Sequence, residues 1–294
     1  MPKIFLTGGS GFIGSRFIQR WKNEYEILSP SHHELDITDA DAVTRYVVMH
    51  LPDIILHIAA ISNTGYCQEH PEESYLVNTL ATITLAKAAK QVGAKFIFFS
   101  SDQVYNGNAE KGLLSEMVTV CPQNHYGCHK LEAENSVLDI IADAVLLRAT
   151  WMYDLPCTDM PAHPNFFTNI KHAMISGTPL YFAINEHRGI THTSEIIEQL
   201  PITFGLPGGV YNYGAENIYN TYETAFNFVK QWKGENMACD IIKADEARFA
   251  EQPRNISISL DKIREVSGGR INFSNTLEGL LKFSSSASNE HSQK

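Results

Sequence analysis

Four glycines follow the first apolar segment of the chain, within the run Gly8-Gly9-Ser10-Gly11-Phe12-Ile13-Gly14. Residues 3–7, which precede them, have the short apolar pattern of a strand, and a helix pattern follows. In such a run Gly8 permits the tight strand-to-helix turn, Gly11 lets a pyrophosphate approach the backbone, and Gly14 lets the helix pack closely. Free N–H groups at the start of a helix bind phosphate oxygens. The run therefore predicts a dinucleotide-binding unit.

The first half of the chain alternates short apolar segments with longer amphipathic ones. Strand patterns cover residues 3–7, 25–29, 53–57, 95–100 and 144–149. Helix patterns cover residues 13–21, 38–49, 73–91 and 125–141, with Thr38 and Asp41 as a capping pair for the second. This alternation predicts an α/β fold, a doubly wound parallel sheet (Rossmann) covered by helices on both faces. The ligand crevice is then expected at the carboxyl ends of the strands.

After about Trp151 the alternation is lost. Residues 154–164 contain three prolines and predict a loop. Later patterns predict helices over residues 165–176, 193–200, 221–232 and shortly after Leu260, and strands over 180–184 and 208–213, the last in the main sheet. We therefore expect a dinucleotide-binding domain at 1–155 and a smaller C-terminal α/β lobe, mainly substrate-binding, at 156–283. Segments at about 178–215 return to the main domain, and 284–294, rich in Ser, Asn and Gln, form a flexible tail.

Composition excludes several classes of function. The chain of 294 residues is 44% hydrophobic, which is enough for a sizeable core, and its net charge of −10 argues against nucleic acid as a partner. No apolar run approaches the ~20 residues of a membrane span, and no signal-peptide pattern precedes the first strand, so we expect a cytoplasmic protein. Five scattered cysteines indicate free thiols. The spacing of Cys121, His125, Cys128 and His129 matches no structural zinc pattern, so no metal is expected.

A tyrosine and a lysine four residues apart predict a proton relay. Tyr126 and Lys130 share one face of a predicted helix, and Ser101 ends a predicted strand 25 residues upstream of Tyr126. A free phenol titrates near ~10, and a neighbouring ammonium lowers that pKa. Ser101 can bind a substrate carbonyl oxygen beside the tyrosine. Such a pair occurs on many helices by chance, and only its combination with the glycine run and Ser101 indicates a nucleotide-dependent oxidoreductase.

The end of the second predicted strand bears on the choice of cofactor. Residues 28–33 read Leu-Ser-Pro-Ser-His-His, with no carboxylate to bind a ribose 2′-hydroxyl. This favours NADP over NAD. Candidate neighbours of a 2′-phosphate are Arg16, Ser31 and His32. Glu34 or Asp36 could still reach the ribose, so NAD stays open.

Three runs of residues together resemble the extended short-chain dehydrogenase/reductases. They are Thr-Gly-Gly-Ser-Gly-Phe-Ile-Gly at 7–14, Ser-Ser-Asp-Gln-Val-Tyr at 100–105 and Tyr-Gly-Cys-His-Lys at 126–130. Further matches resemble the dTDP-4-dehydrorhamnose reductase (sugar nucleotide-binding) branch of that family. These are Glu34-Leu35-Asp36-Ile37-Thr38-Asp39, Pro52-Asp53, His57-Ile58-Ala59-Ala60, Val77-Asn78, Gly93-Ala94 and Leu147-Arg148-Ala149-Thr150-Trp151-Met152-Tyr153. The resemblance covers residues 1–150 and continues more faintly to about residue 262.

The resemblance implies a reductase that converts the C4 ketone of a nucleotide-linked 6-deoxysugar to an alcohol with NADPH or NADH. In it, Tyr126 would be the general acid, Lys130 would tune its pKa, and Ser101 would polarise the ketone. The implied cofactor-binding residues are Gly8, Gly11, Phe12, Ile13, Gly14, Asp36, Ile37, Ala59, Ala60, Asn78, Ser100, Tyr126 and Lys130. The implied substrate-binding residues are Asp102, Gln103, Trp151 and Arg254. A homodimer is one assembly that the sequence allows.

The departures from the family pattern lie on the substrate side. Gln103 replaces a tyrosine, the loop after Ala60 reads Thr64-Gly65-Tyr66-Cys67-Gln68, and a Gly-x-Pro-Thr turn reads Gly189-Ile190-Thr191-His192. Two other functions are compatible with the same fold. A nucleotide-sugar 4-epimerase or dehydratase is disfavoured. Dehydratases of this kind usually carry two acidic residues after the hydroxyl residue that ends the strand, whereas here Asp102 alone follows Ser101. A non-catalytic regulatory subunit resembling that of methionine adenosyltransferase is disfavoured by the intact Ser101, Tyr126 and Lys130.

Overall fold

Six parallel strands form the central sheet of the computed structural model, which describes residues 1–108, 110–155, 161 and 164–290. In chain order they are β1 (Lys3–Thr7), β2 (Glu26–Leu28), β3 (Ile54–His57), β4 (Lys95–Ser101), β5 (Val145–Ala149) and β10 (Gly209–Tyr213). Across the sheet the order is β10-β5-β4-β3-β1-β2, with every neighbouring pair parallel. The predicted doubly wound fold is thus confirmed. Strand order reverses between β1 and β3, where open sheets of this type form their ligand crevice.

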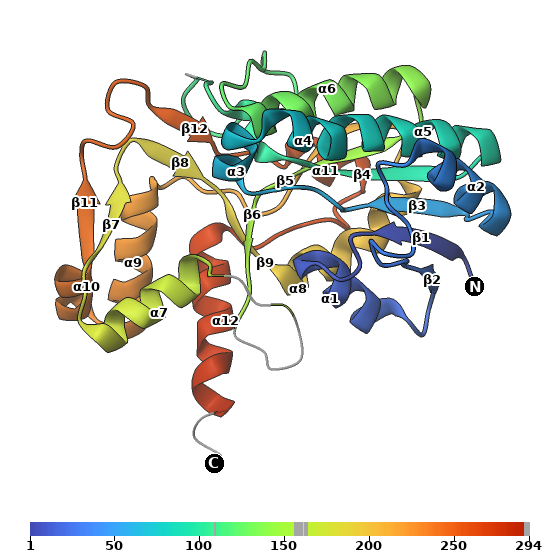
Figure 1. The fold of residues 1–294 in the computed structure, drawn as a ribbon. Helices are drawn as coiled ribbons and strands as arrows, with labels where there is room; N and C mark the ends of the chain where they lie inside the picture. Colours follow the sequence, from blue (N-terminus) through green and yellow to red (C-terminus); the bar gives the residue numbers. More distant parts are fainter. Residues whose placement is uncertain (109, 156–160, 162–163, 291–294) are drawn as a thin grey trace.

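Both faces of the sheet are covered by helices, which explains why its strands are continuously apolar. Along β1, Ile4 and Leu6 face one helix layer and Phe5 faces the other. One layer contains α1 (Phe12–Trp21), α8 (Thr193–Gln199), the 3₁₀ segment Leu200–Gly205 and α11 (Asp261–Val266). The other contains α2 (Ala40–His50), α5 (Ala81–Val92) and α6 (His125–Ile140) (Figure 1).

The start of α2 differs from the sequence prediction. Asp39 is the N-cap residue, and its carboxylate accepts a hydrogen bond from the backbone N–H of Ala42 at 2.9 Å. Thr38 instead donates its hydroxyl to Asp36 at 2.7 Å. The predicted capping pair of Thr38 and Asp41 is therefore wrong, because Asp36 engages the threonine and the next residue caps the helix.

The helix predicted over residues 73–91 is three helical segments. Helix α4 (Pro71–Tyr75) begins at a proline, a π-helical turn covers Leu76–Leu80, and α5 ends at Gly93 with a φ of 72°. The amide of Asn78, inside the π-helical turn, donates to the carbonyl of Ile61 and accepts from its N–H, both at 2.9 Å. Single-turn π-helical segments are frequent at functional sites. Here the turn fixes the loop that leaves β3, which continues into a helix that the sequence did not predict, α3 (Thr64–Glu69).

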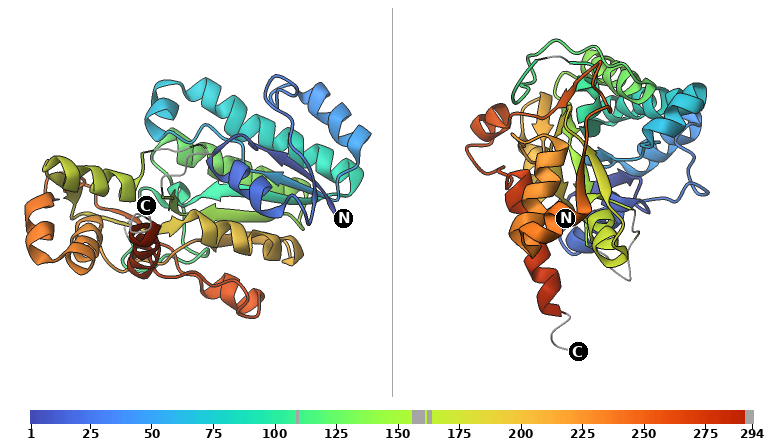
Figure 2. Two further views of the ribbon diagram at one scale, coloured as in Figure 1. Left: turned by 90° about the horizontal axis from the view of Figure 1, so that it is seen from below. Right: turned by 90° about the vertical axis from the view of Figure 1, so that its left-hand side faces the viewer.

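A second group of elements lies at the end of the sheet remote from the N-terminus, in Figure 1 and in the left view of Figure 2. Its strands pair as β6 (Trp151–Tyr153) with β9 (Ile190–His192), β7 (Leu180–Ala183) with β11 (Ile242–Asp245), and β8 (Glu186–Arg188) with β12 (Arg254–Ile256). Its helices are α7 (Phe166–Ser176), α9 (Thr221–Lys233), α10 (Glu235–Ile241) and α12 (Thr276–Glu290), which share an aromatic core. Most of these strands have three residues, too few to show a period of two in the sequence.

Most boundaries predicted for the second half agree with the structure to within two residues, and the segment 208–213 is confirmed as an edge strand of the central sheet. The tail is an exception. The sequence predicts flexibility from Ser284, whereas Ser284 is a buried residue of α12, which continues to Glu290 and packs its apolar face into the lobe. The predicted loop at 154–164 lies mainly outside the described residues, as do residues 291–294. The division into domains stays a prediction. No helix in the described ranges has the length and apolarity of a membrane span.

Candidate active site

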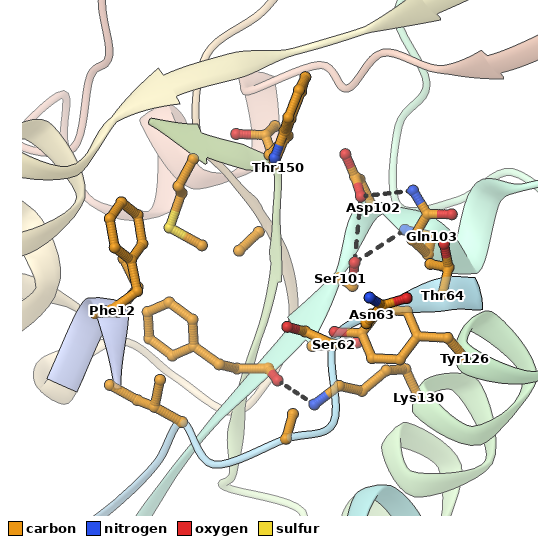
Figure 3. Close-up of a pocket in the computed structure, with 18 of the residues that line it drawn as sticks. Phe12, Ser62, Asn63, Thr64, Ser101, Asp102, Gln103, Tyr126, Lys130 and Thr150 are labelled. Atoms are coloured by element: carbon orange, nitrogen blue, oxygen red, sulfur yellow. Dashed lines mark hydrogen bonds between the residues drawn. The ribbon is translucent and has the colours of Figure 1, made fainter. Parts of the chain in front are cut away.

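A cavity of about 740 Å³ opens at the carboxyl ends of the central strands. The glycine run after β1, the loop after β3, the end of β4, helix α6 and strands β6, β8 and β12 all contribute to its lining. Figure 3 shows Phe12 on one side of this cavity and Tyr126 and Lys130 on the other, with Ser101, Asp102 and Gln103 beside them. Segments predicted separately to bind a dinucleotide and to move a proton therefore meet in one place.

The glycine run forms a phosphate cradle whose shape excludes side chains. Gly8 has a φ of +76°, and a Cβ there would lie 2.8 Å from the backbone nitrogen of Ala59. A Cβ on Gly14 would lie 2.2 Å from the carbonyl oxygen of Gly8, so α1 packs against the turn itself. Gly11 is the N-cap of α1 and offers no side-chain cap. The N-terminus of α1 thus faces the cavity through Gly11 and Phe12, as pyrophosphate binding requires.

We expect Gly14→Ala to weaken cofactor binding by tenfold or more. The added methyl group has only backbone to displace, so the turn must shift, at a cost of about 1–3 kcal/mol in the free energy of unfolding. Titration with NADPH, followed by fluorescence, measures the affinity, and thermal unfolding measures the stability. Gly205→Ala is the matched control, since nothing lies within 4 Å of a Cβ built there. Equal affinity in both variants would contradict the assigned cradle.

The other predicted cofactor residues have different positions. Gly8, Gly11, Phe12, Ile13, Ala59, Ala60, Ser100, Tyr126 and Lys130 line the cavity. Gly14 and Asn78 lie behind the lining and shape it. Asp36 and Ile37 are outside the lining, and the Asp36 carboxylate accepts hydrogen bonds from the N–H and hydroxyl of Thr38. Ser100 donates its hydroxyl to Glu134, whose carboxylate also pairs with Arg148 at 2.7 Å.

Arg16, a candidate neighbour of a 2′-phosphate, already has other partners and lies outside the cavity lining. Its buried guanidinium forms an ion pair with Asp154 and donates to the carbonyl of Phe12 at 2.7 Å. Ser31 is also engaged, because both its N–H and its hydroxyl donate to the Glu34 carboxylate. The role of Arg16 stays a prediction, and its ion pair with Asp154, which is distant in the sequence, disfavours it.

Ser101, Tyr126 and Lys130 are all at least nine-tenths buried and line the same cavity. The α6 N-cap, Asn124, sets the start of the helix that carries the pair. Lys130 Nζ donates to the carbonyl oxygen of Phe99 at 2.8 Å and lies 5.9 Å from the centre of the Tyr126 ring. The three residues are thus brought together as the sequence predicted, with Lys130 behind the tyrosine.

The pKa values differ from the sequence prediction. Burial raises the pKa of Tyr126 well above its usual range, and a hydrogen bond with Ser101 opposes that only in part. Burial also lowers the pKa of Lys130 to about 7. The expected lowering of the Tyr126 pKa by Lys130 is therefore not seen, because desolvation of the phenolate outweighs the distant ammonium. A phenol that keeps its proton suits a residue that must donate one to a ketone.

On the substrate side, Asp102, Gln103, Trp151 and Arg254 all line the cavity. The sequence did not single out Arg188, which lines it too. Its guanidinium lies 4.6 Å above the ring of Trp151 and 3.9 Å from the Asp102 carboxylate. No local pattern marks Arg188, because it lies on the short strand β8, and only the fold reveals that β8 pairs with β12, which carries Arg254.

The two arginines retain unused hydrogen-bond donors. The Nε atoms of Arg188 and Arg254 are buried without a hydrogen-bond partner among the described residues. Glu186 balances their charge in part, with contacts of 3.9 Å and 3.0 Å. Asp102 is buried, and burial raises its pKa although the two arginines oppose that effect. Half-buried guanidinium groups whose Nε–H donors are free and shielded from water suit an anionic ligand such as a diphosphate.

The described residues contain no group of three or more His, Cys, Asp or Glu side chains placed to hold a metal ion. Cys128 donates its thiol to the carbonyl of Pro122, and His129 contacts the Ser74 hydroxyl. Of the four residues of the disfavoured zinc site, Cys128 and His129 thus have other partners, and the rings of His125 and His129 lie 5.8 Å apart.

Known proteins resemble this protein over nearly the whole of its chain. The family model described as RmlD substrate binding domain matches residues 2–284. A dTDP-4-dehydrorhamnose reductase of Aggregatibacter actinomycetemcomitans is 24% identical over 91% of this chain and 94% of its own. The crystal structure of a dTDP-4-dehydrorhamnose reductase of Bacillus anthracis in complex with NADP is 20% identical, with a TM-score of 0.82 over 97% of this chain and 99% of its own.

A more distant structure shares the same architecture. UDP-glucose 4-epimerase of Thermotoga maritima, solved with UDP-glucose, is 19% identical, with a TM-score of 0.77 over 97% of this chain and 99% of its own. At this identity the likeness shows the fold alone. The match of the family model over nearly the whole chain is the stronger finding, and the protein belongs to the RmlD substrate-binding domain family.

Proposed function

We propose that this protein is an NAD(P)H-dependent reductase of the C4 ketone of a nucleotide-linked 6-deoxysugar. The main support for this proposal is that Ser101, Tyr126 and Lys130 line the same cavity as the glycine cradle. A catalytic acid in reach of a dinucleotide site is what ketone reduction requires. Membership of the RmlD family supports the reductase over the epimerase, dehydratase and regulatory readings.

The residues divide the chemistry between them. The reduced nicotinamide, when bound, supplies a hydride to the carbonyl carbon. Ser101 and Tyr126 donate hydrogen bonds to the ketone oxygen, and the Tyr126 hydroxyl transfers its proton to that oxygen as the alcohol forms. Lys130 holds the end of β4 through Phe99 and supplies a positive charge, when protonated, behind the phenol that becomes negative. Hydride and proton together make the new C–H and O–H bonds.

NADPH is the preferred cofactor in this proposal. The segment after β2 presents serines and histidines, and its nearby carboxylates are already hydrogen-bonded, Glu34 to Ser31 and Asp36 to Thr38. A ribose 2′-hydroxyl therefore lacks a free carboxylate partner there, whereas His32 is exposed near the same turn. The NADP complex of the Bacillus anthracis relative supports this preference.

Arg188 and Arg254 hold the substrate diphosphate, and Trp151 lies against the sugar. Trp151 is fixed by the Arg188 guanidinium that lies over its ring. We place the reaction in the cytoplasm, which free thiols support, since Cys67, Cys121, Cys128 and Cys239 are all unpaired. Cys157 lies outside the described residues.

The assay uses purified protein, dTDP-4-dehydrorhamnose and either NADPH or NADH, and follows the loss of absorbance of the reduced nicotinamide. We expect one cofactor oxidised per ketone reduced, with NADPH the faster. Cofactor binding without oxidation would point instead to a non-catalytic role. Isomerised sugar without net oxidation would indicate an epimerase.

A further inference from the structure

The side chain of Gln103 is held in one orientation by two asparagines. Its Oε1 accepts hydrogen bonds from Asn124 Nδ2 at 3.1 Å and from Asn106 Nδ2 at 3.3 Å. Its Nε2 is then on the side of Asp102, whose Oδ1 lies 3.5 Å away. Gln103 is nine-tenths buried or more and lines the cavity. The amide thus presents N–H donors, not its oxygen, beside the carboxylate.

A helix cap determines this orientation. Asn124 is the N-cap of α6, and its Oδ1 accepts the backbone N–H of Gly127 at 2.6 Å. A backbone N–H can only donate, so Asn124 must meet it with oxygen and turn its nitrogen toward Gln103. Gln103 in turn must meet that nitrogen with oxygen. The direction of the donor in the cavity therefore follows from the start of the catalytic helix.

Next to this donor lies an unused acceptor. Asp102 Oδ2 is buried without a hydrogen-bond partner among the described residues, although the Arg188 guanidinium lies 3.9 Å from it, while Oδ1 accepts from Ser101 at 3.2 Å. Figure 3 shows Asp102 and Gln103 adjacent to each other beyond Ser101, with Tyr126 on the opposite side of Ser101. One donor and one acceptor side by side match a hydroxyl group, which both accepts and donates.

We propose that Gln103 is a specificity-determining residue that donates a hydrogen bond to the 3-hydroxyl of a 4-ketosugar, while Asp102 Oδ2 accepts from the same hydroxyl. The inference rests on the proposed function, which places the ketone oxygen at Ser101 and Tyr126. Groups adjoining Ser101 then reach the substituents next to the ketone. In a 4-keto-6-deoxyhexose these are the hydroxyl on C3 and the methyl on C5, and only the hydroxyl can pair with a carboxylate and an amide.

The test compares two substrates, dTDP-4-dehydrorhamnose and the same nucleotide sugar lacking the 3-hydroxyl. We expect the wild type to prefer the hydroxylated substrate in kcat/KM by tenfold or more, since its loss leaves buried polar groups unpaired. In Gln103→Leu this ratio falls toward one, mainly through KM. Gln91→Leu, on an exposed position at the end of α5, is the matched control and keeps the wild-type ratio.

A second variant keeps the Gln103 amide but changes the direction in which its N–H group points. Asn124→Asp keeps a good N-cap for α6 but removes the shorter of the two N–H···O contacts that hold Gln103, leaving the one from Asn106 at 3.3 Å. The Gln103 amide then turns its nitrogen toward the carboxylate at residue 124, and this rotation presents the amide oxygen to the cavity. We expect a ratio reduced like that of Gln103→Leu, at a Tm close to that of the wild type. Calorimetric titration with the two alcohol products gives the same comparison without turnover.

The outcomes distinguish this inference from the proposed function. If the wild type reduces neither ketone with NADPH or NADH, both are overturned. If it reduces both ketones equally well, or if Gln103→Leu keeps the wild-type ratio, the proposed function stands and the role of Gln103 is wrong. An unchanged ratio in Asn124→Asp would overturn the part assigned to the helix cap.

Discussion

Replacing Tyr126 by Phe should lower kcat by about a hundredfold or more and leave NADPH affinity within twofold of the wild type. General acids contribute about 10²–10⁴-fold to such steps. The ring packs in a buried site, and phenylalanine preserves that packing while removing the O–H that donates the proton. Steady-state reduction of dTDP-4-dehydrorhamnose measures kcat, and fluorescence titration measures the affinity.

Tyr181→Phe serves as the control, because Tyr181 is 65% exposed and lies outside the cavity lining. It removes the same hydroxyl group from the same residue type without touching the site. A Tyr126→Phe variant with normal kcat would show that another group supplies the proton, and the catalytic assignment would then be wrong.

The pH dependence expected of this acid follows from its burial. Because burial raises the Tyr126 pKa above its usual range, the phenol stays protonated throughout the neutral and mildly alkaline range. Loss of the proton donor therefore does not limit reduction there. If Lys130 instead lowered the pKa of Tyr126, the enzyme would lose activity as pH rises toward neutrality.

The parts of the site that the sequence predicted are those encoded locally. The glycine run fixes a turn through its own sterics, and a spacing of four places Tyr126 and Lys130 on one helix face. Both need only neighbouring residues. The parallel sheet could be predicted for a similar reason, because strands buried on both faces are apolar throughout.

The parts that the sequence missed depend on contacts between distant segments. Arg188 reaches the cavity only because β8 pairs with β12, and Arg16 is engaged by Asp154 from the second lobe. The pKa values of Tyr126 and Lys130 depend on how deeply each is buried, which spacing does not report. The orientation of Gln103 depends likewise on Asn124, 21 residues away.

Replacing Lys130 by Met should lower kcat by about a hundredfold and yet raise Tm by a few degrees at neutral pH. The charge behind the phenolate is lost, and preorganised electrostatic contacts of this kind contribute about 10²–10³-fold to kcat. The gain in stability arises because a buried ammonium is costly, whereas methionine fills similar space without charge. Glu134 is not left unpaired, since its carboxylate retains Arg148. Thermal unfolding and steady-state kinetics measure the two effects.

The pH dependence of that gain identifies its cause. The Lys130 pKa is about 7 in the folded protein and near the ordinary 10.5 when unfolded, so the unfolded chain binds more protons between these values. The contribution of Lys130 to the free energy of unfolding of the wild type therefore rises with pH from about 7 to 10.5, and the Lys130→Met variant lacks that rise. The excess Tm of the variant is expected to be largest at or below pH 7 and to shrink toward pH 10. The exposed Lys87→Met control should show no such trend. A pH-independent difference would mean that packing, and not the buried charge, separates the two proteins.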